Sequence, residues 1–375
     1  MALRFAILIP AHDERSAIEM KIASTHRLRL PTARGKHLAI VIDDGSTDGT
    51  ADLARSAIAA LPRRHDVEWR VVTNRHGKGK GAALLTGFEE ARGCDLVAMT
   101  DADAVVEADA PIATERAFAQ PRVGVATGTQ RYVARISPEG DPKGDRGDLY
   151  DLLSEGVRRL ESRAGALFSV HGPWLVVRAT TGVRPVAGVG ADDLDLNLQA
   201  RARGLRSVLV PDAVYFEPKP DGRALASQRR RRARAYFEVV DRHLRHARRI
   251  APAPFGGMQF LAYAVAPPLL AIAWLAALAT PVARCVALGK DANVTVAAAL
   301  ATAGLALLRP FSTATVYAAV ILLARLSPPR GPRADRWLPV ARAANGVDGA
   351  TDSADGEDEV MRETAREGRS KPVAP

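Results

Sequence analysis

A repeated pairing of a short apolar run with a polar turn constrains the fold of this chain more than any other feature. Strands buried on both faces of a parallel sheet have this length and composition. Strands that alternate with helices predict an α/β protein with a mostly parallel sheet, flanked by helices and joined by right-handed crossovers. The runs lie at 4–9, 38–42, 67–73 and 96–99, and predicted helices follow the first three at 17–24, 51–61 and 82–91.

The fourth run ends at two carboxylates one residue apart, Asp101 and Asp103. In an open α/β sheet, ligands bind beyond the carboxyl ends of the strands. Two hard oxygen ligands at that edge suit a divalent cation, and the cation would in turn bind a diphosphate. An isolated Asp-x-Asp is more often a turn capped by two solvated acids. The other polar turns decide between these interpretations.

The turns after the first three runs carry residues that suit a nucleotide. Asp43 and Asp44 follow the second run directly, where a carboxylate can accept from a base N–H or a ribose hydroxyl. The segment 74–81 (NRHGKGKG) combines glycines and lysines before a helix, which is typical of an anion site. Its spacing fits neither a P-loop nor a dinucleotide-binding G-x-G-x-x-G. For the residues after Asp44 the alternative is an ordinary capped turn, and for 74–81 it is a flexible basic loop. Glu14, after the first run, is either a nucleoside contact or an acid favoured by the helix dipole.

The chain resembles family 2 glycosyltransferases with the Rossmann-like GT-A fold in four motifs, which occur in the same order and at similar intervals: IPAHDE, VIDDGSTDGT, NRHGKGKGAAL and DAD. The most specific of the four is VIDDGSTDGT. The resemblance implies a nucleoside-diphosphate sugar donor, most commonly linked to UDP with GDP as an alternative. It implies Mg²⁺ or Mn²⁺ held by Asp101 and Asp103. Matched residue by residue, it implies that the donor is bound by Pro10, Ala11, Glu14, Asp43, Asp44, Lys80 and Asp101.

The acceptor half is expected after the Asp-x-Asp. It begins with a predicted strand at 123–129 and continues through a polar loop at 141–148, which we expect to be mobile. An amphipathic helix follows at 151–164, and then a strand-like run at 167–177 that is interrupted near its middle. In that interruption, Trp174 either stacks on an acceptor sugar or packs in the core.

Asp192 and Asp193 open a further predicted helix, which has apolar residues at i, i+4 and i+8. Carboxylates are favoured in a first helical turn by the dipole alone. The family usually has Glu-Asp at this place. The resemblance therefore implies that Asp193 is the catalytic base that deprotonates an acceptor hydroxyl, with Asp192 beside the acceptor or the diphosphate. It also implies inversion at the anomeric carbon without a covalent intermediate.

The stretch Gln228–Arg232 resembles the Gln-x-x-Arg-Trp motif of membrane-bound polysaccharide synthases in this family. Gln228 and Arg231 match, whereas Arg232 occupies the position of the Trp. The missing Trp argues against processive polymer synthesis. The matched residues would bind the donor diphosphate or a phosphate of a lipid acceptor.

Apolar segments after the arginine-rich stretch predict membrane contact. The stretch itself, 223–250, is expected to be a basic helix on the membrane surface, with Tyr236 and Phe237 entering lipid. Residues 258–283 are uncharged and long enough to cross a bilayer, and 293–324 adds one kinked crossing or two short segments. Arginines flank both sides of this region, so we expect a multi-pass protein of the cell membrane with its catalytic domain in the cytoplasm.

Charge and cysteine content narrow the classes further. The net charge of +10 and the arginine cluster suit an anionic partner. Because the cluster continues into an apolar segment, we expect a membrane and no nucleic acid. Cys94 and Cys285 imply no disulfide framework. The expected organisation is a catalytic domain at 1–222 (nucleotide-sugar half 1–103, acceptor half 104–222), a basic helix at 223–250, a membrane region at 258–324 and a disordered tail at 327–375.

These expectations combine into one function with two alternatives. The chain is expected to be an inverting, metal-dependent glycosyltransferase that moves a sugar to a lipid-linked or glycan hydroxyl at the membrane. The first alternative is a polyprenyl-phosphate sugar synthase, in which the lipid phosphate is the nucleophile and needs no strong base. The second is a catalytically silent membrane protein that binds nucleotide sugars.

Overall fold

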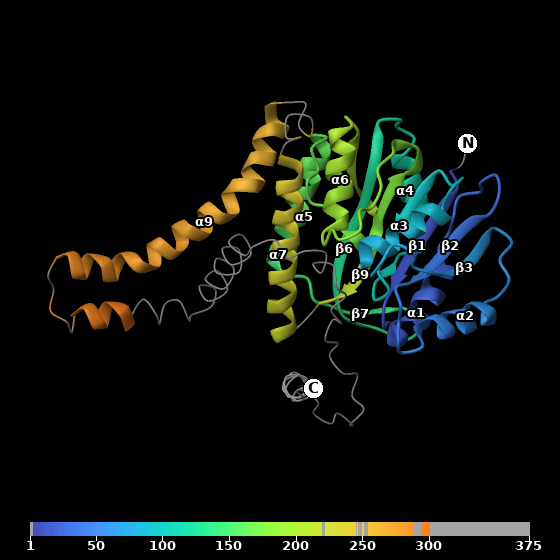
Figure 1. Cartoon of the computed structure of the whole chain (residues 1–375), viewed down its shortest axis with the longest axis horizontal. Helices are drawn as coiled ribbons and strands as arrows, with labels where there is room; N and C mark the ends of the chain where they lie inside the picture. Colours follow the sequence, from blue (N-terminus) through green and yellow to red (C-terminus); the bar gives the residue numbers. More distant parts are fainter. Residues whose placement is uncertain are drawn as a thin grey trace, which may run out of the picture. The chain divides into compact units, whose positions relative to one another are not determined.

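The computed structural model describes residues 3–219, 222–244, 246, 250, 254–288, 291 and 294–300 (Figure 1). Contacts divide the chain into Met1–Val340 and Ala341–Pro375, and the second unit lies outside the described residues. The predicted tail at 327–375, and the predicted second membrane segment beyond residue 300, also lie outside them.

Four parallel strands form the first half of the sheet, in the order β3-β2-β1-β4. Apolar side chains fill both faces of β1, β2 and β4, as the uninterrupted apolar runs predicted. Proline does not end β1, because Pro10 still pairs in register with Ile42 of β2. The bounds are β1 Phe5–Ala11, β2 His37–Asp43, β3 Val67–Thr73 and β4 Leu96–Met99.

Alternate residues of β1 face different helices. Ile9 packs with Ile18 and Ile22 of α1 on one face, whereas Leu8 packs with Leu84 of α3 on the other. Gly87 of α3 has no room for a side chain, since a Cβ there would lie 2.8 Å from Leu8 Cδ1. The helices that follow the first three strands are α1 Arg15–His26, α2 Thr50–Ala60 and α3 Lys80–Glu90.

The second half makes the sheet mixed rather than mostly parallel, which corrects the sequence prediction. Beyond β4 the order is β8-β6-β9-β5, with β8 antiparallel to both β4 and β6, and β9 parallel to β6. The run at 167–177 provides only the short β8, because a 3₁₀ turn, η1 (Gly172–Trp174), precedes it. The bounds are β5 Val105–Val106, β6 Val123–Ile136, β8 Leu175–Arg178 and β9 Arg206–Pro218.

The polar loop that was predicted to be mobile contains a strand. β7 (Pro142–Asp145) pairs antiparallel with the far end of β6, for example Val133 with Asp145. Backbone hydrogen bonds hold this exposed segment, so hydrophobic periodicity gave no signal for it. The remaining helices of the sheet domain are α4 Ala110–Ala117, α5 Leu149–Arg163 and α6 Asp192–Ala202.

Helix α7 (Gly222–Leu244) packs on the sheet domain, with Val239 and Val240 in one apolar cluster with Leu194 of α6. Phe237 is buried, and the Tyr236 hydroxyl donates to the carbonyl of Tyr263. The expectation that these two aromatics enter lipid is therefore wrong, because protein already covers them.

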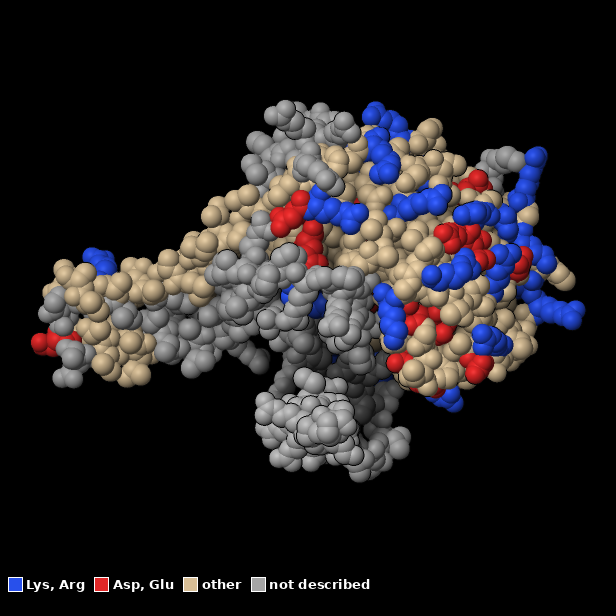
Figure 2. All heavy atoms as spheres, in the orientation of Figure 1, with Lys and Arg blue, Asp and Glu red and all other residues tan. Residues whose placement is uncertain are grey.

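Helix α9 (Pro254–Ala287) contains the predicted first membrane segment. Within it, Ala262–Pro281 is long and apolar enough to cross a membrane, and 12% of this stretch is buried. It is the one such helix in the described part of the chain, by length and composition. In the space-filling view, Lys, Arg, Asp and Glu are interspersed over the sheet domain, whereas the described part of α9 is almost free of them (Figure 2).

Candidate active site

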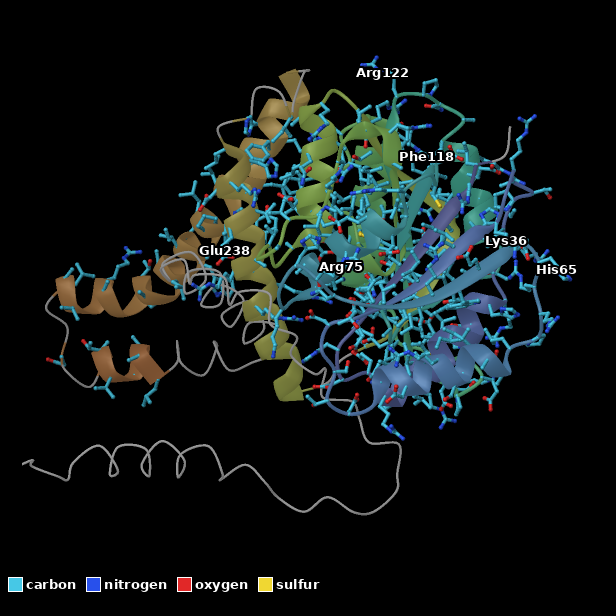
Figure 3. All side chains as sticks on the ribbon, turned by 45° about the vertical axis from the view of Figure 1, so that its right-hand side comes forward. Lys36, His65, Arg75, Phe118, Arg122 and Glu238 are labelled. Carbon is cyan, nitrogen blue, oxygen red and sulfur yellow. The ribbon has the colours of Figure 1, made fainter. Side chains whose placement is uncertain are left out.

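The predicted donor residues follow strands that end at one edge of the sheet. Lys36 and His65, which precede β2 and β3, lie at one end of the strands, and Arg75, which follows β3, lies at the other (Figure 3). At the carboxyl edge, Ala11 pairs with Asp43, and the amide of Asp44 donates to the carbonyl of Ala11. The turns predicted to bind the donor are thus neighbours in space, because parallel strands share their carboxyl edge.

Asp44 holds the glycine-rich loop in place. Its buried carboxylate accepts from the Gly79 amide at 2.6 Å and from the side-chain amide of Asn74. Gly79 has φ 117°, a backbone conformation that side chains disfavour. Asp44 therefore supports the loop whose next residue is Lys80, in addition to any contact with a nucleoside.

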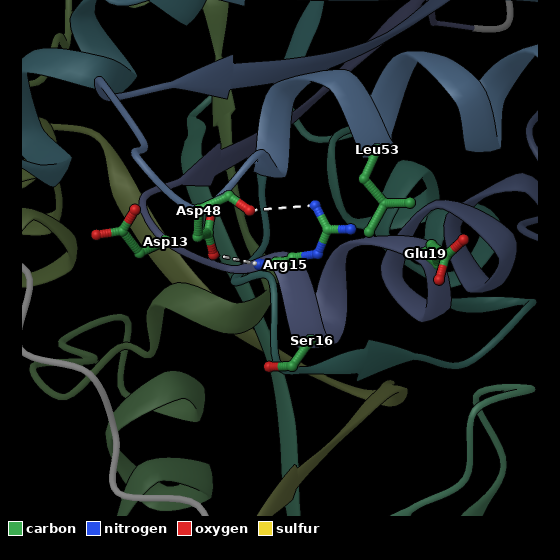
Figure 4. Close-up of a pocket in the computed structure, with 6 residues that line it drawn as sticks. All are labelled: Asp13, Arg15, Ser16, Glu19, Asp48 and Leu53. Atoms are coloured by element: carbon green, nitrogen blue, oxygen red, sulfur yellow. Dashed lines mark hydrogen bonds between the residues drawn. The ribbon is translucent and has the colours of Figure 1, made fainter.

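A shallow hollow lies beside the first turn. It has a volume of about 480 Å³. The Arg15 backbone amide donates to the Asp48 carboxylate, and the Arg15 guanidinium donates to the Asp48 carbonyl (Figure 4). None of the predicted donor residues lines it, and Glu14 lies next to it as the N-cap of α1. We therefore do not place the donor there. Its lining residues are Asp13, Arg15, Ser16, Glu19, Asp48 and Leu53.

Lys80 connects the two chemical centres predicted from the sequence. Its Nζ lies 2.7 Å from Asp101 Oδ1 and 3.9 Å from Asp192 Oδ2. Burial acts to lower the pKa of Lys80, but the Asp101 and Asp192 carboxylates outweigh it and raise that pKa. Burial acts to raise the pKa of Asp101, but Lys80 outweighs it and lowers that pKa. A Cβ at Gly172 would lie 3.2 Å from Lys80 Nζ, so the 3₁₀ turn also borders this point.

Asp192 and Asp193 stand in the first turn of α6, facing this cation. Burial raises the pKa of Asp192 to about 7, with Lys80 opposing and Asp193 adding to the rise. Burial also raises the pKa of Asp193, whose Oδ1 accepts from the Leu194 amide at 2.8 Å. Asp192 Oδ2 is buried and, among the residues that the structure describes, has no hydrogen-bond partner, with Lys80 Nζ 3.9 Å away. Asp192 thus has both a pKa near neutral pH and a carboxylate oxygen that could accept from a ligand.

Glu217 of β9 is a site residue that the sequence analysis missed. It pairs in register with Tyr132 of β6, and its carboxylate accepts from the Gln130 side-chain amide. Burial and the nearby Asp103 carboxylate raise the pKa of Glu217 to about 7, while Arg232 opposes the rise. Pro211 and Asp212 interrupt the apolar pattern of β9 (Arg206–Pro218), so no pattern placed Glu217 at this edge.

Arg231 and Arg232 of α7 lie within the electrostatic reach of these acids. Burial and its neighbour Arg232 lower the pKa of Arg231, and Asp101 and Asp192 oppose that effect. Burial acts to lower the pKa of Arg232, but Glu217 and the Tyr132 phenol outweigh it and raise that pKa. The backbone of Gln228 belongs to α7, and its side chain lies outside the described atoms.

Lys21 is a second residue that the sequence analysis missed, and it holds the two residues that flank the Asp-x-Asp turn. It is buried in α1, and its Nζ donates to Thr100 Oγ1 at 2.5 Å and to the Ala104 carbonyl at 2.8 Å. Burial lowers the pKa of Lys21 to about 7, against the attraction of Asp101 and Asp103. A lysine in an amphipathic helix gives no sequence signal of such a role.

Trp174 is the predicted acceptor residue that the structure removes from the site. Its side chain is fully buried, and its indole N–H donates to Thr114 Oγ1 at 2.9 Å. The core alternative therefore applies, because a buried ring has no face left for a sugar. His171, at the same turn, contacts the Tyr215 hydroxyl at 2.7 Å through Nδ1.

The acidic residues offer a cation two protein ligands rather than a complete cage. Within the described residues, no group of three or more His, Cys, Asp or Glu side chains could hold a metal ion. Mg²⁺ commonly binds to one or two carboxylates together with substrate phosphates. Asp101 and Asp103 are the carboxylates that would hold an ion in that mode, together with a diphosphate.

The fold defines a GT-A-like α/β protein with acidic residues and a lysine at the carboxyl edge of its sheet, and comparisons with known proteins agree. Residues 6–159 match glycosyl transferase family 2. The solved mannosyltransferase PcManGT from Pyrobaculum calidifontis, in complex with GDP-Man and Mn²⁺, has a TM-score of 0.65 and 27% identity over 87% of this chain and 86% of that one. The chain therefore carries a family 2 glycosyltransferase domain with a GT-A-like α/β fold, which confirms the expected family.

Two relatives of known name are enzymes with different reactions. Poly-beta-1,6-N-acetyl-D-glucosamine synthase of Staphylococcus aureus (strain COL) is 27% identical over 242 residues, which are 62% of this chain and 54% of that protein. The chain thus spans about half the length of that relative. Undecaprenyl-phosphate 4-deoxy-4-formamido-L-arabinose transferase of Shewanella sediminis is 37% identical over 99 residues, 26% of this chain and 28% of that protein.

Proposed function

We propose that this chain transfers a sugar from a nucleoside-diphosphate donor to a hydroxyl of a lipid-linked or glycan acceptor, with inversion at the anomeric carbon. The observation that carries the proposal is the position of Lys80 between Asp101 and Asp192. It joins the end of a nucleotide-binding strand to the first turn of a helix with two buried acids. Donor and acceptor chemistry would meet at that point.

The donor diphosphate is assigned to Lys80, Asp101 and Asp103, and the nucleoside to Pro10, Ala11, Glu14, Asp43 and Asp44. Asp101 and Asp103 would hold Mg²⁺ or Mn²⁺, as the Mn²⁺ complex of PcManGT supports. A bound divalent ion would neutralise charge on the leaving nucleoside diphosphate. Lys80 and Arg231 would add positive charge on the protein side.

The base is assigned to Asp193. The acceptor oxygen would bond to the anomeric carbon as the bond from that carbon to the diphosphate oxygen breaks. The hydroxyl proton would pass to the Asp193 carboxylate. Asp192 Oδ2 is buried and lacks a hydrogen-bond partner within the described part of the chain, so it would receive a second hydrogen bond from the acceptor. The raised pKa of Asp193 makes it a stronger base than an exposed aspartate.

A polyprenyl-phosphate acceptor is the second candidate, and the match to the undecaprenyl-phosphate transferase favours it. A phosphate nucleophile is already ionised and needs no base. Asp193→Asn would then leave most of the transfer intact, whereas a hydroxyl acceptor requires the carboxylate. A catalytically silent protein would bind donor and release no nucleoside diphosphate.

The proposed location is a cell membrane, with the catalytic domain (1–222) and α7 on the cytoplasmic side. The apolar stretch Ala262–Pro281 supports an anchor, and arginines precede it along the chain. If α9 spans the bilayer, full-length protein will stay in the pellet after high-salt and carbonate extraction. Release into the supernatant would contradict the anchor.

A thermal-shift panel on detergent-solubilised full-length protein tests the donor assignment. UDP- and GDP-linked sugars are compared with and without Mn²⁺. A metal-dependent rise in melting temperature with one nucleotide class is expected, because a ligand that binds only the folded state stabilises it. Absence of a shift with every nucleotide sugar would contradict donor binding.

A further inference from the structure

Helix α5 is turned with its polar side toward the protein. Arg158 is 2% exposed, and its guanidinium donates to the carbonyls of Gly128 and Ser169, each at 3.1 Å. Glu161 is also buried, and its Oε2 accepts from the Phe168 amide at 3.1 Å. A buried charge without such partners is strongly unfavourable, so these contacts fix the rotation of the helix.

The outward side of α5 is apolar. Its large side chains recur at spacings of three and four residues, which places them in one stripe. A surface helix of a water-soluble protein shows the opposite arrangement. Rotating α5 to bury this stripe would expel Arg158 and Glu161 from their partners, so the exposure is built into the fold. The stripe is 46–70% exposed and consists of Leu149, Leu152, Leu153, Val157 and Leu160.

Helix α9 contacts the carboxyl end of α5. Glu161 Oε1, at the carboxyl end of α5, accepts from the side chains of Gln259 and Tyr263 at 2.7 Å each. The two helices therefore touch where α9 enters its apolar stretch, Ala262–Pro281. Large apolar side chains are exposed on α9 as well, at Val265, Leu269, Leu270 and Ile272.

Cations border the stripe. Arg159 and Arg163 of α5 are exposed, one and three residues from Leu160, and Arg159 also donates to Glu155 Oε1 at 3.0 Å. Apolar residues flanked by arginines are the pattern of a helix that lies in a membrane surface, where the arginines meet lipid phosphates. A folded protein partner would have to match both the stripe and the exposed face of a helix of bilayer length.

We propose that α5 lies on the bilayer surface with this stripe in lipid, as a second membrane contact beside α9; this rests on the membrane location proposed above. Through Arg158 and through Glu155, which accepts from Thr129 Oγ1 at 3.2 Å, α5 is attached to β6. The same strand carries Gln130 and Tyr132 beside Glu217. The acceptor side of the site then faces the membrane, which specifies an acceptor carried by a lipid.

Site-specific fluorescence in vesicles tests this contact. In full-length protein with Cys94→Ala and Cys285→Ser, an environment-sensitive fluorophore is attached at Leu152→Cys. Leu270→Cys on α9 and Asp52→Cys on α2, whose side chain is 88% exposed, are the matched controls. The protein is reconstituted in phosphatidylcholine–phosphatidylglycerol vesicles with or without brominated acyl chains. Brominated lipid should quench the labels at 152 and 270 to a similar extent and leave the label at 52 unchanged.

Each other outcome has a defined meaning. Quenching at 270 alone would overturn the contact of α5 and leave the anchor intact. No quenching at either position would contradict the membrane location itself. A blue-shifted label at 152 without quenching would mean that protein covers the stripe, either a second copy or the apolar segment after residue 300, and would overturn the proposal. The thermal shift with sugar nucleotides is measured on the same preparations. A loss of donor binding can then be distinguished from a loss of the membrane contact of α5.

Discussion

The Lys80 ammonium donates to Asp101 Oδ1 at 2.7 Å and lies 3.9 Å from Asp192 Oδ2. The three residues are supplied by the start of α3, the end of β4 and the start of α6. A single cation thus holds together the Asp-x-Asp turn and the acidic helix. An arriving diphosphate would find this ammonium already positioned.

Replacing that cation should abolish most transfer. Lys80→Ala is expected to lower nucleoside-diphosphate release by about 10²–10³-fold, because a fixed charge beside the leaving group is lost. Lys36→Ala is the matched control, since Lys36 is exposed and lies at the opposite end of the strands (Figure 3). Equal rates for the two variants would remove Lys80 from the mechanism.

The proposed base gives the sharpest test of acceptor chemistry. Asp193→Asn should reduce transfer by about 10²–10⁴-fold, the usual contribution of a general base. Donor-induced stabilisation in the thermal-shift assay should persist. Asp212→Asn, at an exposed position of β9, controls for loss of a negative charge. Retained turnover would exclude Asp193 as the base and favour a phosphate acceptor.

The burial of Asp192 predicts a pH-dependent stability difference. Its pKa of about 7 lies above the unfolded value near 4, so the folded state binds more protons between these values. Its contribution to stability is therefore largest at low pH and is lost as pH rises through about 7. Asparagine has no proton to lose. The melting temperature of Asp192→Asn, relative to wild type, should increase from pH 5 to pH 8, and a pH-independent difference would contradict the assignment.

Metal dependence is expected to act through two carboxylates. EDTA should remove transfer, and Mn²⁺ or Mg²⁺ should restore it. Asp103→Asn should raise the Mn²⁺ concentration that is needed for donor binding, as measured by titrating Mn²⁺ in the thermal-shift assay. Asp52→Asn, on the exposed surface of α2, should leave that concentration unchanged. Full activity in EDTA would count against the metal site.

The contact between α6 and α7 predicts a stability effect away from the site. His243 Nε2 lies 2.8 Å from Oδ1 of Asp195, and both side chains are buried. His243→Ala should lower the free energy of unfolding by about 1–3 kcal/mol, because a buried carboxylate loses a partner. Urea denaturation measures this, with His65→Ala at an exposed loop as control. An unchanged midpoint for His243→Ala would show that the contact contributes nothing.

Local apolar pattern was sufficient for the first half of the fold. β3 and β4 occur at the predicted residues, and α6 begins at the predicted acidic pair. Buried parallel strands are uninterrupted apolar runs, so a short window of sequence contains the signal. The order of strands in the second half was not predicted, because antiparallel insertion of β8 depends on partners far away in the chain.

The sequence by itself determined the family and the positions of the acids at strand and helix ends, since these are short segments with their own chemistry. Only the tertiary structure decided what those segments face. It buried Trp174, brought Glu217 and Lys21 to the Asp-x-Asp turn, and rotated α5 so that its leucines point outward. Burial and electrostatic contact depend on residues that are distant in sequence. The periodicity of one helix therefore does not predict which of its faces the rest of the protein covers.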